Sequence, residues 1–377
     1  MKVKVQRGEL KKLKNNLTGI DFKFLVMVYA LLAFGLIMVL SASSPIAYAS
    51  KSTNYDSFFY FKKQLLWAVI GTVGLVFMAN FDYRRLKKYA WWAYAGNIFI
   101  LLFVLVAGKS VNGAKRWLQI GGFSFQPTEF SKILVIVFYA YLLSETYKKV
   151  GKLRVLFIYG ALLGVVAALI MLQPHMSCTI LIVASVAIML FVAGMKWSHI
   201  SVIGILGVAG AFVLAMTSEY RRARMLTFLE PFKDIQGDGW QIVQSLYAIG
   251  SGGIFGAGLG QSRQKYMNIP EPQNDFIFSI LAEELGILGC ILVIVMFVYL
   301  IYRGIKIALS APDMFGKLLA SGIIGLVAIQ VFINIAVVTS TMPVTGMPLP
   351  FFSYGGTALA VTMAEMGIIL NISKHSE

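Results

Sequence analysis

A carboxylate at the edge of an apolar segment is the strongest chemical signal in this sequence. Asp275 ends a long polar stretch, and Phe276 and Phe278 follow it at the start of an apolar run. Aromatic neighbours withdraw a carboxylate partly from water, and burial makes it a better general base near neutral pH. The alternative is a helix N-cap, because Asp accepts hydrogen bonds from the first free N–H groups of a helix. The two roles can coexist, and the local pattern leaves both open.

The polar stretch before this carboxylate, residues 217–275, is the one long hydrophilic segment after the first span and is rich in glycine. Glycines let a backbone approach a ligand closely and aim its N–H groups at an anion. Arg263 and Lys265 in the same stretch would suit a phosphate group. The alternative is a set of turns and helix stops in a surface loop. The substrate-binding candidates in this stretch are Trp240, Gln244, Ser245 and Lys265.

A second polar cluster lies upstream of another apolar run. Lys115 offers a point charge and Arg116 a planar fork for phosphate oxygens. Glu129 and Lys132 are three residues apart, so on a helix their side chains could pair. All four are substrate-binding candidates. The alternative is a set of cationic anchors at a membrane surface with one helix-surface ion pair.

The segment 345–356 cannot form a regular helix, because it contains Pro348, Pro350 and three glycines. Irregular backbone at membrane depth must face water or protein. We expect this segment to line the same cavity as Asp275, and we count Ser353 among the substrate-binding residues. A tight turn outside the membrane is the alternative.

Three further polar positions are given structural interpretations. Glu283 and Glu284 would lie about 12–14 Å beyond Asp275 along a helix. They would point in different directions, which favours a buried polar network over a shared catalytic role. His175 is a lone histidine at a predicted helix break, and the spacing of the 3 His and 2 Cys residues offers no zinc-ligand set. No metal site is predicted.

Composition indicates that the elements positioning these residues lie in a membrane. Apolar residues make up 58% of 377 positions, charged residues 13%, and the mean hydropathy is +0.76. Soluble domains carry about 25% charged residues. The net charge of +16 would favour nucleic acid as the partner of a soluble protein. Here it is typical of the excess of cations at the inner membrane face, so no nucleic-acid partner is expected.

The sequence therefore predicts an all-α, polytopic membrane protein with about ten transmembrane helices. A span needs about 20 mostly apolar residues. The ten segments that meet this rule lie near residues 22–42, 65–81, 90–107, 129–145, 154–172, 178–195, 199–217, 276–302, 318–338 and 356–373.

The charge distribution predicts how these spans are oriented. With both termini inside, the inner segments carry 20 Lys and Arg residues and the outer segments 12, with Lys132 inside a span. This bias favours cytoplasmic termini and an even number of spans. Residues 1–21 are then a basic cytoplasmic tail, and residues 217–275 form an extracytoplasmic loop between the seventh and eighth spans. No domain boundary is evident, so residues 1–377 are predicted to form a single transmembrane domain.

Four separated motifs, in order on these spans, resemble the SEDS family (shape, elongation, division and sporulation proteins). The resemblance covers nearly the whole chain. It is carried by NGAKRWL at 112–118, QPTE at 126–129, the loop from Trp240 to Asp275, and PLPFFSYGG at 348–356. NGAKRWL and the Phe58-Phe59-Tyr60-Phe61 segment resemble the FtsW/SpoVE branch more than RodA.

The resemblance implies a peptidoglycan glycosyltransferase in the bacterial cytoplasmic membrane. Such proteins polymerise lipid II into glycan strands at the outer face, together with a class B penicillin-binding protein that cross-links the product. The essential acidic residue of the family falls on Asp275, and its other important positions on Arg116, Glu129 and Lys132. Many members have Pro-Asp-Leu-Gly-Thr where this chain has Pro174-His175-Met176-Ser177-Cys178-Thr179. Any role of that aspartate cannot be transferred to this chain.

This reading gives Asp275 the role of general base and makes undecaprenyl pyrophosphate the leaving group. Lys115, Arg116, Lys132 and Lys265 would then face the departing phosphates. A divalent cation, Mg²⁺ or Mn²⁺, could share that role, although no dedicated ligand set or other cofactor motif is evident. Two alternatives remain. The chain could be a lipid II flippase with Glu283 or Glu284 relaying protons, or a scaffold that recruits the transpeptidase.

Overall fold

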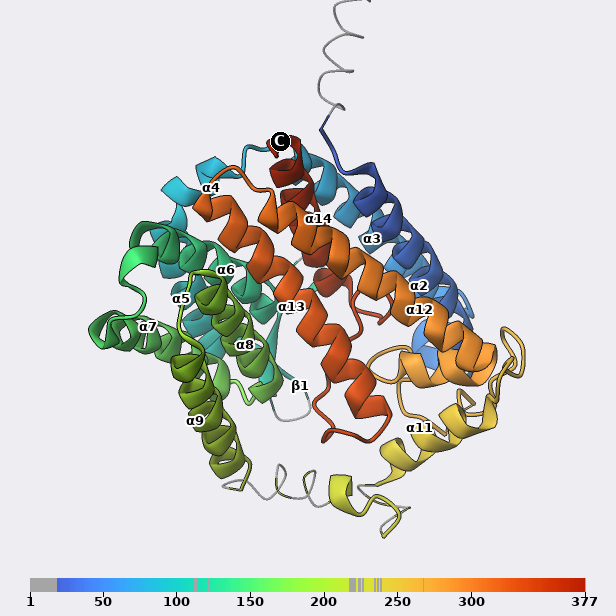
Figure 1. Ribbon diagram of the computed structural model, residues 1–377. Coiled ribbons are helices and arrows are strands. Elements are labelled where there is room, and N and C mark those ends of the chain that lie inside the picture. Colours follow the sequence, from blue (N-terminus) through green and yellow to red (C-terminus); the bar gives the residue numbers. More distant parts are fainter. Residues whose placement is uncertain are drawn as a thin grey trace, which may run out of the picture.

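The computed structural model describes residues 19–111, 114–120, 123–216, 222, 225, 227–233, 235, 237, 239–266 and 268–376. Its main elements are helices that run side by side (Figure 1). They are α2 (Phe22–Ala49), α3 (Phe59–Asn80), α4 (Arg84–Lys88), α5 (Ala90–Ala107), α6 (Pro127–Thr146), α7 (Leu153–Leu172), α8 (Met176–Val192), α9 (Trp197–Met216), α11 (Trp240–Ser251), α12 (Ile277–Leu309), α13 (Met314–Val338) and α14 (Gly356–Lys374), with 3-10 turns at Lys51–Thr53 and Tyr147–Lys149.

Each of the ten predicted spans falls on one of these helices. Among the described residues, eight helices are long and apolar enough to cross a membrane, namely α2, α3, α5, α6, α7, α12, α13 and α14. The apolar helix α8 is shorter, at 17 residues, and α9 has 20 residues. The prediction of a polytopic helical membrane protein is confirmed, and the helix boundaries differ from the prediction by up to seven residues.

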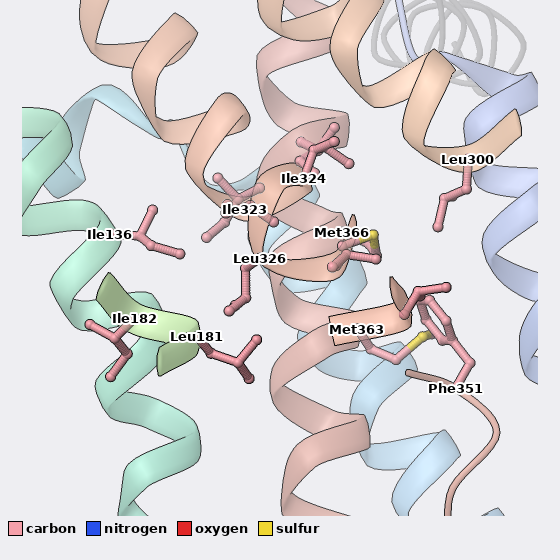
Figure 2. Packing of buried hydrophobic residues seen from close by; sticks show 14 of the residues in the cluster. Ile136, Leu181, Ile182, Leu300, Ile323, Ile324, Leu326, Phe351, Met363 and Met366 are labelled. Atoms are coloured by element: carbon pink, nitrogen blue, oxygen red, sulfur yellow. The ribbon is translucent and has the colours of Figure 1, made fainter. Parts of the chain in front are cut away.

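The core of the bundle is formed around α13 and α14. In each of these helices 72% of the most apolar window is buried, against 17% in α7, so α7 lies at the periphery. α13 packs against α6, α8 and α12, while α14 packs along α3. Figure 2 shows Ile136 of α6, Leu181 of α8 and Ile323 of α13 within this cluster. The exposed faces of the outer helices remain apolar, as a lipid solvent requires.

A small antiparallel sheet interrupts the helices and was not predicted. Strand β2 (Ala114–Ile120) pairs with β1 (Lys109–Val111) on one side and with β3 (Phe123–Phe125) on the other. The two intervening dipeptides, Asn-Gly at 112–113 and Gly-Gly at 121–122, lie outside the described residues. Both dipeptides are strong hairpin signals between short strands. The prediction of an all-α chain missed them, because membrane composition dominated the interpretation.

Helix α12 is broken near its start. Gly286 has φ 65° and ψ −166°, which is not helical, and residues Ile277–Leu309 continue on both sides of it. The loop after α11 fits into this break: the N–H groups of Ala257 and Gly258 donate to the carbonyls of Glu283 and Glu284 at 2.9 and 3.0 Å. The break therefore joins the polar loop rigidly to a spanning helix.

Candidate active site

Asp275 lines a cavity of about 270 Å³ at the end of the molecule where α11 lies, opposite the C terminus (Figure 1). The side chain is partly buried, as expected. The N-cap position of α12 belongs to Phe276, so Asp275 lies one residue before the cap and the simple N-cap alternative is wrong. The cavity is lined by Gln241, Pro270, Glu271, Asn274, Asp275 and Phe276.

The backbone at Asp275 is held by an amide that was not singled out in the sequence. Asn334 of α13 donates from Nδ2 to the carbonyl of Asp275 at 2.8 Å and to that of Met347 at 2.7 Å. The segment 345–356 also approaches Asp275 closely, since a Cβ on Gly346 would lie 3.4 Å from Asp275 Oδ2. A lone Asn within an apolar run was the signal for this role, because amides inside a membrane need partners.

Ser353 fastens the segment 345–356 to the residues beside Asp275. Its Oγ donates to the carbonyl of Asn274 at 2.7 Å and accepts from the N–H of Leu349 at 2.7 Å. The N–H of Tyr354 donates to the carbonyl of Gln273 at 2.8 Å. Because the Ser353 hydroxyl is buried and uses both functions, its predicted contact with substrate gives way to a positioning role.

The candidates on α11 face the protein as well. Ser245 is fully buried and donates from Oγ to the carbonyl of Val338 at 2.8 Å, and Gln244 is also buried. Trp240 donates from its indole to the carbonyl of Asn268 at 2.5 Å, which steadies the loop. Gln241 lines the cavity instead. It was missed because the direction in which each α11 side chain points depends on how the helix docks.

Lys265 also differs from the prediction. Its side chain is 3% exposed, and its ammonium group forms an ion pair with Glu284 at 2.7 Å and donates to Ser41 Oγ at 3.1 Å. Neighbouring Glu283 accepts from the N–H of Arg263 at 2.9 Å and from Ser262 Oγ. The predicted polar network of the two glutamates is present. Lys265 belongs to it, so its charge is neutralised inside the protein and is not directed at an outer phosphate.

The glycines of the loop allow its backbone to approach α12 closely. A Cβ on Gly256 would collide with the carbonyl of Glu284, and a Cβ on Gly252 with that of Ala282. Gly256 also has φ +79°, a conformation that L residues rarely adopt. The described geometry therefore favours close packing over a phosphate cradle at these two positions.

Replacement of Gly256 tests this packing. Gly256→Ala should lower the free energy of unfolding by at least about 1–3 kcal/mol, which is the strain of a residue other than glycine in the left-handed conformation. The matched control is Gly250→Ala, because a Cβ there meets no atom within 4 Å and Gly250 lies inside α11. That change should be neutral or slightly stabilising. Thermal unfolding in detergent measures both, and equal effects would contradict the packing role.

The second predicted cluster is built from β2 and α6. Arg116 donates from Nε to the carbonyl of Gln173 at 3.0 Å and from a terminal nitrogen to that of Pro174. Lys132 pairs with Glu129 at 2.8 Å, and both side chains are more than nine-tenths buried. The predicted pair is confirmed, but the alternative of a helix-surface pair is wrong, because α6 turns this face inward. Lys115 is exposed.

A buried carboxylate on α14 joins this cluster and was not singled out. Glu365 is 2% exposed and lies within electrostatic range of Lys132 and Glu129. Glu365 Oε1 has no hydrogen-bond partner in the described part of the chain. Its position in an apolar run was the available signal, since ionisable groups inside a membrane are costly.

The segment 345–356 connects the two clusters. Ser177, in the first turn of α8, donates to the carbonyl of Thr345, and the next residue, Gly346, lies against Asp275. At its other end Thr357 Oγ1 donates to the carbonyl of Ser124 in β3 at 3.4 Å. The segment therefore lies between Asp275 and the Arg116 cluster. It was expected to line the cavity of Asp275, but the described lining residues of that cavity include none from 345–356.

His175 is half-buried between α7 and α8, next to the Pro174 carbonyl that Arg116 contacts, and its ring Nδ1 is inaccessible. Burial, with the charges of Arg116 and Lys132, lowers the pKa of His175 to about 3. An unfolded histidine has a pKa of about 6.5, so between these values the unfolded chain binds more protons. The contribution to stability is complete above pH 6.5 and is lost as the pH falls.

A pH titration of unfolding tests this linkage. Between pH 7 and pH 5, wild-type protein should lose about 2 kcal/mol of unfolding free energy more than a His175→Asn variant. The variant serves as the control because other acids titrate equally in both proteins. Parallel pH profiles would show that His175 is not held neutral.

The described residues include no group of three or more His, Cys, Asp or Glu side chains that could hold a metal ion. Glu271 and Asp275 both line the cavity, but two carboxylates do not define a metal site.

These features define a multi-pass membrane protein with a carboxylate-lined cavity at one end of the bundle. The family model for cell cycle proteins of the FtsW, RodA and SpoVE type matches residues 22–377. Stage V sporulation protein E of Bacillus subtilis (strain 168) is 43% identical over 364 residues, covering 95% of this chain and 98% of that protein. The chain therefore belongs to this family of cell cycle proteins, in the bacterial cytoplasmic membrane.

Other relatives agree in sequence and fold. A probable peptidoglycan glycosyltransferase FtsW of Geobacter sp. (strain M18) is 40% identical over 358 residues, covering 94% of this chain and 97% of that protein. A chain of a peptidoglycan synthase complex that coordinates polymerization and crosslinking has a TM-score of 0.78 at 28% identity, covering 94% and 97%. Rod shape determining protein RodA of Thermus thermophilus gives 0.70 at 27%, covering 95% and 98%. The expected likeness to FtsW and SpoVE is confirmed.

Proposed function

We propose that this peptidoglycan glycosyltransferase polymerises lipid II at the outer membrane face, with Asp275 as the general base. Asp275 removes the proton from the 4-hydroxyl of the acceptor sugar. The acceptor oxygen attacks the anomeric carbon of the growing chain and forms the glycosidic bond. The bond from that carbon to the pyrophosphate breaks, and undecaprenyl pyrophosphate leaves with the bonding electrons.

The observation that carries this proposal is the placement of Asp275. The carboxylate lines an open cavity, while Asn334 holds its backbone from behind and Gly346 packs against its Oδ2. A base held in one place reduces the entropy lost on reaching the transition state. A positioned base supplies about 10²–10⁴-fold in rate. Orientation and charge stabilisation supply the rest.

Two cations of β2 are candidates for binding the leaving pyrophosphate. Lys115 is exposed, and Arg116 is partly buried and anchored by the carbonyls of Gln173 and Pro174. The two carbonyls hold the guanidinium in one orientation, which lowers the entropic cost of a further charge-assisted contact with a phosphate oxygen. Lys132 and Lys265 are already paired with carboxylates, so we assign them a structural role. Lys115 and Arg116 remain as the proposed ligands of the phosphates.

The flippase alternative loses its proposed proton relay. It required Glu283 or Glu284 to exchange protons within the membrane, but both carboxylates accept hydrogen bonds from the loop or from Lys265. The scaffold alternative does not account for a carboxylate in an open cavity. A class B penicillin-binding protein remains the proposed partner, supported by likeness to a chain of a complex that also crosslinks.

Polymerisation from purified components tests the function. The protein is supplied with lipid II in detergent, alone and with a co-purified transpeptidase, and glycan strands are resolved on a gel. We expect strands that lengthen with time. Strands formed in neither reaction, with lipid II transported across vesicles, would favour the flippase. Strands that form equally well when this chain is replaced by a site variant in the complex would favour the scaffold.

A further inference from the structure

A second cavity lies at the opposite end of α12 from Asp275. It has a volume of about 470 Å³ and is wide open to its surroundings. Helix α12 spans 33 residues from the Asp275 end to this cavity, so the two sites are separated by the length of the bundle (Figure 1). The described residues that line it are Asp21, Arg303, Lys306, Ile307, Leu309 and Ser310.

Both oxygens of the carboxylate in this cavity already bind groups of the protein. Asp21 caps α2, accepting from the N–H of Phe24 on Oδ1 at 2.9 Å, and its Oδ2 forms an ion pair with Arg303. The N–H of Asp21 in turn donates to Ser373 Oγ at 3.1 Å. Asp21 therefore holds the guanidinium of Arg303 at the wall of the cavity. It neutralises only one of the two cations that line the cavity.

The second cation, Lys306, forms no ion pair with a carboxylate in the described part of the chain. Lys306 is exposed, and its ammonium group lies 4.8 Å from the centre of the Tyr302 ring. Arg303 Nε has no hydrogen-bond partner among the described residues. With one carboxylate against two cations, the cavity carries a net charge of +1, which suits a singly charged anion.

The lining is apolar beside these cations. Ile307 and Leu309 line the cavity, and on the membrane side of the cations Ile305, Tyr302 and Val298 continue an exposed apolar face along α12. A small soluble anion would gain nothing from apolar residues, whereas a lipid brings an acyl chain with its phosphate. The charge distribution of the sequence places this end of the bundle at the cytoplasmic face, where the leaflet is rich in anionic lipids.

We propose that this cavity binds the phosphodiester head group of an anionic membrane lipid. The phosphate lies between Arg303 and Lys306, and the acyl chains extend back towards the middle of α12, along the exposed side chains of Tyr302 and Val298. The site is separate from the glycosyltransferase chemistry, and it would couple the anchoring of α12 to the lipid composition of the inner leaflet.

Native mass spectrometry of the purified full chain tests the proposal, with phosphatidylglycerol as the probe and zwitterionic phosphatidylcholine for comparison. Lys306→Gln should weaken phosphatidylglycerol binding about fivefold, the effect of one cation near a lipid surface. The matched control is Lys148→Gln, because Lys148 is also exposed, lies over the Tyr147 ring and is predicted on the same face, outside the cavity. It should bind like wild type.

A double variant, Asp21→Asn with Arg303→Gln, removes the ion pair without leaving one charge alone and should also weaken binding. The proposal is overturned if Lys306→Gln and Lys148→Gln lose binding equally, or if phosphatidylcholine binds as well as phosphatidylglycerol. Soluble glycerol phosphate that displaces the lipid at equal concentration would assign the cavity to small anions and would also overturn it.

Discussion

Asp275→Asn should lower the rate of polymer formation from lipid II by about 10²–10⁴-fold, the contribution of a positioned general base. The amide has nearly the shape of the carboxylate but cannot accept the sugar proton at neutral pH. Asn334 holds the backbone carbonyl of residue 275, so that contact survives the change. Binding of lipid II should therefore be retained. Rates come from a gel assay of polymer, and binding from a fluorescent lipid II.

The matched control for this prediction is Glu271→Gln. Glu271 lines the same cavity and accepts from Asn274 Nδ2 at 2.7 Å, so the change removes a second charge from the same place. We expect a much smaller loss of rate. Equal losses in the two variants would indicate that the cavity needs negative charge in general, and normal polymerisation by Asp275→Asn would remove Asp275 as the base.

Lys132→Met should produce the largest loss of stability among the substitutions considered. The change leaves the Glu129 carboxylate buried without its partner, and breaking a buried pair in this way costs about 3–5 kcal/mol. Both side chains are more than nine-tenths buried, so water cannot screen the remaining charge. Thermal or denaturant unfolding in detergent measures the change.

The double variant Glu129→Gln with Lys132→Met should recover much of that loss, because neither charge then remains alone. A second control is Lys233→Met. Lys233 pairs with Glu230 at the same 2.8 Å and the same i,i+3 spacing, but both side chains are exposed. We expect no measurable change there, since exposed pairs contribute little. If Lys132→Met and the double variant lose the same free energy of unfolding, the unpaired buried charge of Glu129 is not the cause of the loss.

The elements of this protein were predictable because they are set by local patterns. An apolar run of about 20 residues forms a helix in lipid whatever surrounds it, since its backbone must satisfy its own hydrogen bonds. Each of the ten predicted spans is therefore present as a helix. The pairing of Glu129 with Lys132 follows from helical spacing in the same way. The hairpins of β2 were also encoded locally, in Asn-Gly and Gly-Gly dipeptides.

The function of individual side chains was decided by tertiary contacts. Lys265 looks like a loop cation in the sequence, but the break in α12 at Gly286 brings the loop against Glu284 and buries the charge. Ser245 and Ser353 face inward for the same reason, because their helix and loop dock onto α13 and onto the residues beside Asp275. The sequence by itself determined which segments form apolar helices and which residues are polar. The direction of each polar side chain depended on contacts between residues far apart in the chain, and local pattern carries no record of them.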